Sequence, residues 1–285
     1  MVRVRHASGL YLGPEKLRLG TVKPLQQRKT WAGLGFSIIC LAGWLGSLML
    51  LLTSDPALTK LELIITIAVR TFLQTGLFIL AHDAMHQSLW PSNARLNHTL
   101  GTIALWCYAG LDYQQCSRNH VQHHRSPGSG KDPDLQGKKK DIFRWYLNFL
   151  ANYLHLKQIL KILLNVSILT VLSTHFLGMW QSLFHLTLFY FLPLIFSSLQ
   201  LFIFGTYLPH REICGEPPLP HHARSLDYPQ WLSLLLCFHF GYHWEHHEYP
   251  QLPWYQLPEA RKWKILPINS ASSALMPSRE LSSVL

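Results

Sequence analysis

Histidines are the residues of this chain whose number and spacing point to chemistry. The sequence has 17 of them in 285 residues, against 15 acidic residues, and most lie in dense groups. Side chains three or four residues apart share one face of a helix, so a group with that spacing can direct its imidazoles at one point. Because imidazole is a common metal ligand, such spacing predicts metal binding. The three groups are His82 with His86, His120 with His123 and His124, and His243 with His246 and His247.

A further histidine, His210, stands at the end of a long apolar run and brings the set to nine imidazoles. Nine exceed what one metal ion binds, and no cysteine stands inside any group, as it often does in structural zinc sites. Two metals with four or five imidazoles each would keep positions open for substrates. Nitrogen-rich, open, paired sites suit iron and oxygen chemistry, but imidazole also suits zinc, copper and nickel, so spacing leaves the element open.

Carboxylates near the histidine groups are candidates for orienting the imidazole rings, because ligating histidines commonly donate their second N–H to such a partner. Solvated loop carboxylates are the alternative for at least half of them. The carboxylates near the groups are Asp83, Asp132, Asp134, Asp227, Glu245 and Glu248, of which Asp83, Asp132, Asp134 and Glu245 are the candidates for this role. The isolated histidines are expected to be surface or helix-end residues, namely His6, His98, His155, His175 and His185. The sequence does not assign a role to His221, His222 and His239.

Long apolar runs must position these side chains. The chain is 48% apolar and 14% charged, against about 25% charged in an ordinary soluble domain. Four runs are long enough to cross a bilayer. Arg70 lies inside the second and is expected to face protein or a polar cavity, because a charge is costly in lipid. The expected spans are residues 31–52, 61–81, about 159–178 and about 183–208.

Two shorter apolar stretches, Thr99–Gly110 and Trp231–Tyr242, are expected to dip into the membrane without crossing it. The fold class predicted is an all-α integral membrane protein, with four transmembrane helices and a cytoplasmic helical cap that carries the histidine groups. Three domains follow: a basic cytoplasmic tail (1–30), one membrane-embedded catalytic domain (31–266) and a disordered tail (267–285).

The net charge of +10 indicates orientation. Basic residues concentrate in the N-terminal tail, at Lys138–Lys140 and at Arg261–Lys264, and such segments stay cytoplasmic. Four spans place all three segments, both termini and every metal-binding group on the cytoplasmic side. Membrane orientation explains the basic residues better than nucleic-acid binding does, since these residues do not follow one amphipathic face. The five cysteines contain no C-x-x-C, which argues against a disulfide framework or an iron–sulfur site.

Four stretches carry a specific resemblance to a known family. Histidine groups between paired membrane spans resemble the membrane-bound di-iron oxygenase and desaturase superfamily. The sequence Tyr207-Leu-Pro-His-Arg211 and the surroundings of the last group are similar to the bacterial carotenoid 4-ketolases in particular. The four stretches are His82–Leu89, Asn119–His124 followed by Asp132-Pro-Asp134, Phe204–Arg211, and Gly241–Pro250 with Pro253-Trp254.

The resemblance implies two non-haem irons held by the nine histidines, with O2 as co-substrate. It implies a lipid-soluble carotenoid such as β-carotene, whose β-ionone ring is hydroxylated twice at C4 and loses water to give a ketone. The chain has no dinucleotide fingerprint, so an external donor such as a reduced ferredoxin must supply electrons. Aromatic residues near the groups are candidates for steering the ring, although packing and anchoring at the membrane interface are the roles expected of each one singly. They are Trp90, Trp106, Tyr113, Trp244 and Trp254.

Other functions remain open at this point. A carotenoid hydroxylase and a fatty-acyl desaturase or hydroxylase of the same superfamily would share the metal site. A histidine-rich metal transporter is the non-enzyme alternative, although transporters place coordinating groups near the bilayer midplane and these groups lie beyond the helix ends. The sequence leaves undecided whether hydroxylated rings are accepted, whether one or both rings are oxidised, the oligomeric state and the identity of the donor.

Overall fold

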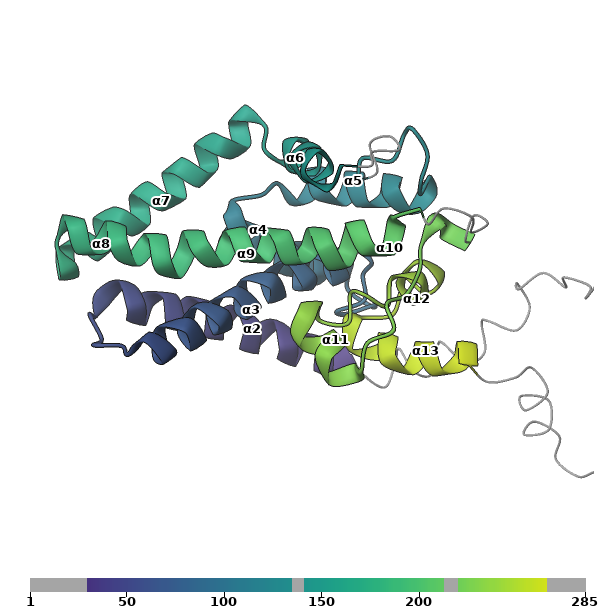
Figure 1. Cartoon of the computed structure of the whole chain (residues 1–285), viewed down its shortest axis with the longest axis horizontal. Helices are drawn as coiled ribbons and strands as arrows, with labels where there is room; N and C mark the ends of the chain where they lie inside the picture. Colours follow the sequence, from purple (N-terminus) through teal and green to yellow (C-terminus); the bar gives the residue numbers. More distant parts are fainter. Residues whose placement is uncertain (1–29, 135–140, 213–219, 266–285) are drawn as a thin grey trace, which may run out of the picture.

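A computed structural model describes residues 30–134, 141–212 and 220–265 (Figure 1). The two predicted tails and the Lys138–Lys140 loop lie outside these residues, apart from the first residue of α2. Within the described part the regular structure is helical, with one isolated antiparallel bridge between Ser225 and Tyr242. The predicted all-α class is confirmed.

Four helices are long and apolar enough to cross a membrane, as predicted. Two form an antiparallel hairpin, α2 (Thr30–Thr53) and α3 (Lys60–Met85). The third, α7 (Leu156–Leu177), turns at Gly178 into a continuous helical rod of 32 residues. Two π-helical turns interrupt the rod, whose parts are α8 (Met179–Leu186), η1 (Thr187–Phe191), α9 (Leu192–Leu201), η2 (Phe202–Tyr207) and α10 (Leu208–His210).

The start of α3 is fixed by a capping box, which sets the register of the histidines at its other end. The backbone N–H of Thr59 donates to the Glu62 carboxylate at 2.8 Å, and the Glu62 N–H donates to the Thr59 hydroxyl. This reciprocal arrangement satisfies two of the amides that a helix start leaves unpaired. His82 therefore stands in the last turn of α3, with His86 as its C-terminal cap residue.

Arg70 lies inside the bundle, 1% exposed, as its place in an apolar run predicts. Its Nε donates to the Phe189 carbonyl at 3.0 Å, and Nη1 donates to the Trp44 carbonyl and the Ser47 hydroxyl at 2.7 and 2.8 Å. The guanidinium also stands over the Trp44 ring, 5.3 Å from its centroid. These contacts link α2, α3 and η1. A charged side chain that would be costly in lipid therefore joins the α2–α3 hairpin to the rod that contains η1.

Shorter helices gather with the ends of α3 and α10 at one end of the bundle (Figure 1). One of them, α4, packs on α3 at Gly101, where a Cβ would come within 2.9 Å of the Ala84 Cβ. The cap consists of α4 (Ala94–Ala109), α5 (Tyr113–Arg125), α6 (Ile142–Tyr153), α11 (Gln230–Cys237), α12 (His243–Glu248) and α13 (Leu257–Ile265), with 3-10 turns η3 (Pro220–His222) and η4 (Trp254–Gln256).

The apolar helix expected over Trp231–Tyr242 ends earlier, at Cys237. Phe238 and His239 have φ values of +47° and +60°, and their N–H groups donate to the carbonyls of Leu234 and Ser233. This is a left-handed helix end that usually holds glycine. Phe238 occupies it because its ring stacks on Phe72, with 4.2 Å between ring centroids. The resulting turn redirects the chain, so that α12 begins at His243.

Candidate metal centre

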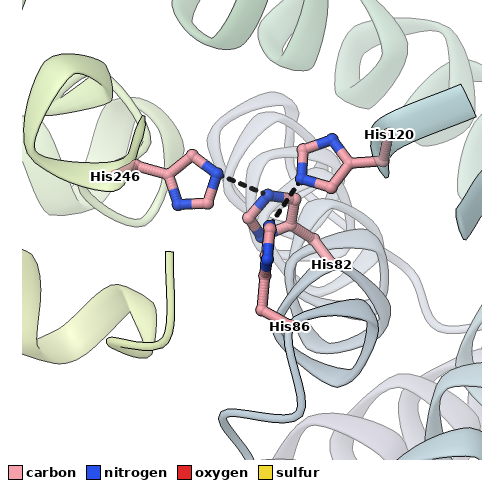
Figure 2. A group of neighbouring side chains, drawn as sticks. All are labelled: His82, His86, His120 and His246. Carbon is pink, nitrogen blue, oxygen red and sulfur yellow. Dashed lines mark hydrogen bonds between the residues drawn. The ribbon is translucent and has the colours of Figure 1, made fainter. Parts of the chain in front are cut away.

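The structure brings all nine predicted histidines together, although they come from four separate elements. They stand at the end of α3, on α5, at the end of α10 and on α12. Eight of them form two groups of four, in each of which the ligand nitrogens lie within 4.8 Å of one another. The first group is His82, His86, His120 and His246 (Figure 2), and the second is His123, His210, His243 and His247.

In the first group the Nε2 atoms converge (Figure 2). The Nε2 of His82 lies 3.2 Å from that of His246, and the Nε2 of His86 lies 2.7 Å from that of His120. A neutral imidazole carries only one N–H, so four nitrogens that point at one centre cannot all be satisfied by one another. Such a centre matches the donor set of a metal ion.

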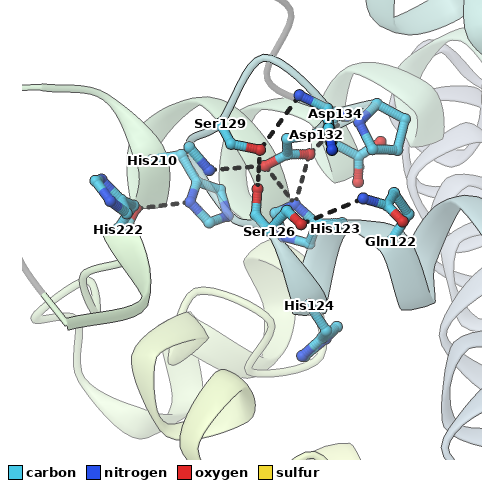
Figure 3. Close-up of polar contacts among 12 residues, drawn as sticks. Gln122, His123, His124, Ser126, Ser129, Asp132, Asp134, His210 and His222 are labelled. Carbon is cyan, nitrogen blue, oxygen red and sulfur yellow. Dashed lines mark hydrogen bonds and ion pairs between the residues drawn. The ribbon is translucent and has the colours of Figure 1, made fainter.

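The second group is built in the same way. The Nε2 of His247 lies 3.0 Å from that of His123 and 3.1 Å from that of His243. His210 also contributes its Nε2, which is buried and has no hydrogen-bond partner among the described residues, while its Nδ1 donates to the His222 carbonyl at 2.8 Å (Figure 3). An orphaned ring nitrogen in such a place fits a metal ligand, because a buried polar atom without a partner is costly.

His124 belongs to neither group and lies between them. Its Nε2 is 2.9 Å from the Nε2 of His246 in the first group. Its ring stacks on His247 of the second group, with 4.2 Å between ring centroids. The three histidines of the His-x-x-His-His motif on α5 therefore point to different places. His120 faces the first group, His123 faces the second, and His124 faces the space between the two groups.

One carboxylate orients a ring of the centre. Both oxygens of Asp132 lie within hydrogen-bond distance of His123 Nδ1, at 2.9 and 3.0 Å (Figure 3). Asp132 also accepts the backbone N–H groups of Gly128 and Asp134, at 2.9 Å each. We infer that Nδ1 of His123 carries the proton, which leaves the Nε2 lone pair directed at the second group.

The other three candidate carboxylates accept hydrogen bonds from groups other than imidazole rings. Asp83 accepts the Trp254 N–H at 3.1 Å and lies 3.5 Å from His82 Nδ1 without a hydrogen bond. Asp134 accepts the Tyr153 hydroxyl at 3.0 Å. Glu245 accepts from the Ser225 hydroxyl, and Arg261 lies 3.4 Å away. These three carboxylates hold the loops and helices around the centre rather than an imidazole ring.

Burial keeps most of the imidazoles outside the membrane spans neutral. Burial, with the nearby His123, lowers the pKa of His86 to about 4, and burial with several neighbouring imidazoles lowers the pKa of His124 to about 2. The same causes, burial first, place the pKa of four more imidazoles well below the usual range, namely His120, His243, His246 and His247. Neutral imidazole is the form that binds metal.

His123 is the exception. Burial lowers the pKa of this imidazole, but the hydrogen bond to Asp132 and the charges of Asp132 and Asp134 outweigh burial and raise it. In the metal-free protein His123 therefore holds a proton more firmly than its neighbours do. A metal at the second group would displace a proton only from Nε2 of His123, while the Nδ1 proton stays in the hydrogen bond to Asp132.

The histidines that the sequence left unassigned lie around the centre. The His222 carbonyl accepts from His210, and His221 Nε2 lies 2.8 Å from a Glu248 carboxylate oxygen. His239 stacks on the Tyr242 ring at an interplanar angle of 4°. His185, expected to be a surface or helix-end residue, is 3% exposed, and its Nδ1 lies within hydrogen-bond distance of the Leu51 carbonyl.

A small cavity of about 30 Å³ borders both groups, since His82, His120, His123 and His243 line it. None of the five aromatic residues proposed to steer a substrate ring is among its lining residues. Sequence reasoning missed the residues that do line it, because no spacing motif marks them. They are Phe78, Met85, Cys116, Phe149, Tyr153, Leu201, Gly205, Thr206 and Phe240, while Asp134, a predicted candidate carboxylate, lines the cavity as well.

The chain matches a known family over the part that carries the histidines. The sequence model of the family "Fatty acid desaturase" matches residues 59–276, which include all nine histidines. The chain is 38% identical to the beta-carotene ketolase of Paracoccus sp. (strain PC1) over 245 residues, which cover 84% of this chain and 96% of that protein.

Two further curated proteins illustrate the range of relatives. The beta-carotene ketolase of Paracoccus sp. (strain N81106 / MBIC 01143) is 42% identical over 192 residues, which cover 67% of this chain and 76% of that protein. The zeaxanthin 4-ketolase of Chlamydomonas reinhardtii is 38% identical over 194 residues, which cover 67% of this chain and 42% of that protein. No solved structure matches the chain significantly.

Proposed function

This chain belongs to the fatty acid desaturase family, and from that membership we propose that it is a membrane-bound carotenoid oxygenase, a beta-carotene 4-ketolase. The proteins named as ketolases match it over two thirds or more of its length, in bacteria and in algae. The reaction introduces a keto group at C4 of the β-ionone ring, which converts β-carotene through the mono-ketone echinenone to canthaxanthin.

Two iron ions are the proposed cofactors, and the observation that carries this proposal is the pair of four-imidazole groups. The buried, unpartnered Nε2 of His210 supports it, because that atom points to a ligand that the protein itself does not supply. His124 is the proposed ninth ligand, added to the first group through its approach to His246. Bound iron would supply, with O2 and electrons, the oxidant for hydroxylating a C–H bond.

The proposed reaction balances in three steps. Each hydroxylation consumes one O2, two electrons and two protons, and it releases one water while an oxygen enters the C4–H bond. The second hydroxylation of the same carbon gives a geminal diol, and loss of water leaves the ketone. The protein's own part is to hold the imidazoles, orient His123 through Asp132, and surround the reacting carbon with apolar side chains such as Phe78 and Phe240 that exclude water.

The substrate is proposed to enter from the membrane. β-Carotene is apolar and comparable in length to the ~30 Å hydrocarbon core, so it resides in the bilayer. The cavity beside the histidines is lined by elements of both the bundle and its cap, among them α3, the η2 turn, α5 and α6. We propose that residues 31–266 act as one catalytic unit and that membrane lipids contact its exposed apolar surface.

Electrons are proposed to come from a reduced ferredoxin or a similar donor on the cytoplasmic side. Basic residues remain exposed on the cap, for example Arg125 and Lys131, and they suit an acidic electron carrier. This proposal places the metal centre and both termini in the cytoplasm, in agreement with the charge distribution of the sequence.

Co-expression with a β-carotene pathway, followed by pigment chromatography, tests the function. Wild-type protein should yield 4-keto carotenoids, and the variant His123→Ala should yield none while inserting normally in the membrane. Ring-hydroxylated carotenoids without ketone would indicate a hydroxylase, and altered acyl chains with unchanged pigments would indicate a desaturase or acyl hydroxylase. Metal analysis of the purified protein tests the cofactor: about two irons per active chain support it, and zinc at that stoichiometry in active protein contradicts it.

A further inference from the structure

The cavity beside the metal centre is the starting point, because four histidines from both groups line it. Its volume of about 30 Å³ has room for one or two water-sized groups and not for a six-membered ring. Phe149 and Tyr153 of α6 form part of its wall. A cavity of this volume can hold the reacting carbon atom together with one oxygen atom attached to it.

One hydroxyl on the cavity wall has no partner. Thr206 is 6% exposed, lines the cavity and makes no hydrogen bond among the described residues. Seven threonines in the described helices, including Thr71 and Thr170, instead donate to the carbonyl four residues earlier. Thr206 lies in the π-helical turn η2, where the wider turn shifts that carbonyl. Its hydroxyl remains available to a ligand.

The other polar groups on the wall are already engaged or weak. The Tyr153 hydroxyl donates to Asp134 at 3.0 Å, so the two satisfy each other. The Cys116 thiol is a weak donor. Among the lining residues outside the metal groups, Thr206 thus offers a hydroxyl that makes no hydrogen bond to another described residue.

The position of Thr206 is fixed by its neighbour. A Cβ on Gly205 would lie 2.5 Å from Cδ1 of Phe240, so the Phe240 ring packs directly on the backbone of this turn. The same ring stands edge-on to His82, with 4.6 Å between ring centroids. Phe240 therefore holds the η2 backbone in a defined place relative to the metal centre, and a preorganised hydroxyl can act where a mobile one could not.

We propose that the Thr206 hydroxyl hydrogen-bonds the oxygen that the first hydroxylation leaves at C4, and so retains the alcohol for the second oxidation. This inference rests on the proposed ketolase function. A ketolase must oxidise one carbon twice, and an allylic alcohol that leaves for the bilayer after the first step ends the reaction early. Thr206 is in this view a positioning residue, with no role in the first C–H hydroxylation.

Product ratios in β-carotene-producing cells test the inference. The variant Thr206→Val keeps the shape and removes the hydroxyl, and it should raise the ratio of 4-hydroxy to 4-keto products about three- to tenfold, as expected for one neutral hydrogen bond. Thr206→Ser should restore the wild-type ratio. Thr170→Val, whose hydroxyl bonds only to the Val166 carbonyl, is the matched control and should leave the ratio unchanged.

Three outcomes would overturn the inference: an unchanged ratio in Thr206→Val, an equal increase in Thr206→Ser, or an equal increase in Thr170→Val. If Thr206→Val forms no product, a binding measurement on the purified holoenzyme tests the inference instead. The affinities for 4-hydroxy-β-carotene and for β-carotene are compared, and only a variant that has lost the wild-type preference for the alcohol supports the inference. Failure of the proposed function is distinguishable, because wild-type protein would then make no 4-keto carotenoid at all.

Discussion

Asp132 lies nine residues after His123, and its two carboxylate oxygens stand 2.9 and 3.0 Å from the Nδ1 of that imidazole. The chain between them turns back at Gly128, whose N–H donates to the same carboxylate. Both side chains are almost fully buried. A short loop therefore supplies a fixed carboxylate acceptor behind one ring of the second group, and the acceptor determines which nitrogen of the ring faces the centre of that group.

Removal of this acceptor should weaken metal binding selectively. Asp132→Ala is expected to lower iron affinity at the second group about ten- to hundredfold, because the loss of a carboxylate behind a ligating histidine has that effect. Iron titration of purified protein measures it. Asp227→Ala is the control, since Asp227 is exposed and pairs with Arg261. Equal iron affinity in the two variants would contradict the role of Asp132.

Acid should destabilise the metal-free protein in a defined pH range. The folded pKa of His86 is about 4, while an unfolded histidine titrates near 6.5. Between these values the unfolded chain binds a proton that the folded chain does not, so stability falls as pH drops from about 6.5 towards 4. The thermal midpoint of iron-free protein in detergent measures this slope. His86→Leu should make the slope shallower by the share of one proton, because other buried imidazoles such as His124 contribute to it as well, and His98→Leu should leave it unchanged. A midpoint constant from pH 7.5 to 4.5 rules the explanation out.

The sequence predicted the elements whose signals are local. Apolar runs predicted four spans, and the spacing within the three histidine groups selected eight imidazoles. The ninth, His210, was selected by its place at the end of an apolar run, and the structure brings all nine together. Asp132 was among the candidate carboxylates because it is near His123 in the chain. Each of these signals depends on period, length or short separation, which a single sequence displays.

Other features depend on contacts between distant residues. The division of His120 and His123 between two groups follows from the approach of α3, α10 and α12, which no spacing encodes. Phe238, the left-handed residue that ends α11, packs its ring on Phe72, Phe36 and Trp254, which lie elsewhere in the sequence. Thr206 resembles other helical threonines in sequence, and its free hydroxyl becomes visible only with the π-helical turn and the cavity.

Close helix packing at Gly101 should be sensitive to a single methyl group. In Gly101→Ala the new Cβ would clash with the Tyr113 ring and lie 2.9 Å from the Ala84 Cβ. Overpacking of this kind should lower the free energy of unfolding by about 1–3 kcal/mol. Thermal unfolding in detergent measures it. The control is Gly46→Ala, where the Cβ meets nothing within 4 Å, and equal stability of the two variants would show that α3 and α4 can separate freely.

Membrane sidedness can be measured with single reporter thiols. Lys131→Cys lies in the loop after α5, and Met179→Cys lies at the turn between α7 and α8; both positions are exposed. A membrane-impermeant reagent applied to intact cells should label Met179→Cys and spare Lys131→Cys, since an even number of spans keeps the metal centre cytoplasmic. Labelling of Lys131→Cys from outside would place the centre away from a cytoplasmic electron donor.

His124 should contribute less to iron binding than the members of the two groups. Its Nε2 approaches His246 at 2.9 Å, but the first group already presents four converging nitrogens without it. His124→Ala should therefore reduce iron affinity by less than about tenfold and retain about two irons per chain, whereas His246→Ala removes one of four ligands and should lose one iron.

Because His124 also stacks on His247, its removal loosens the contact between the groups, and ketone formation should fall further than iron content does. Iron analysis and pigment chromatography on the same preparations separate the two effects. Loss of a full iron in His124→Ala would instead make it equal to the other four ligands of the first group.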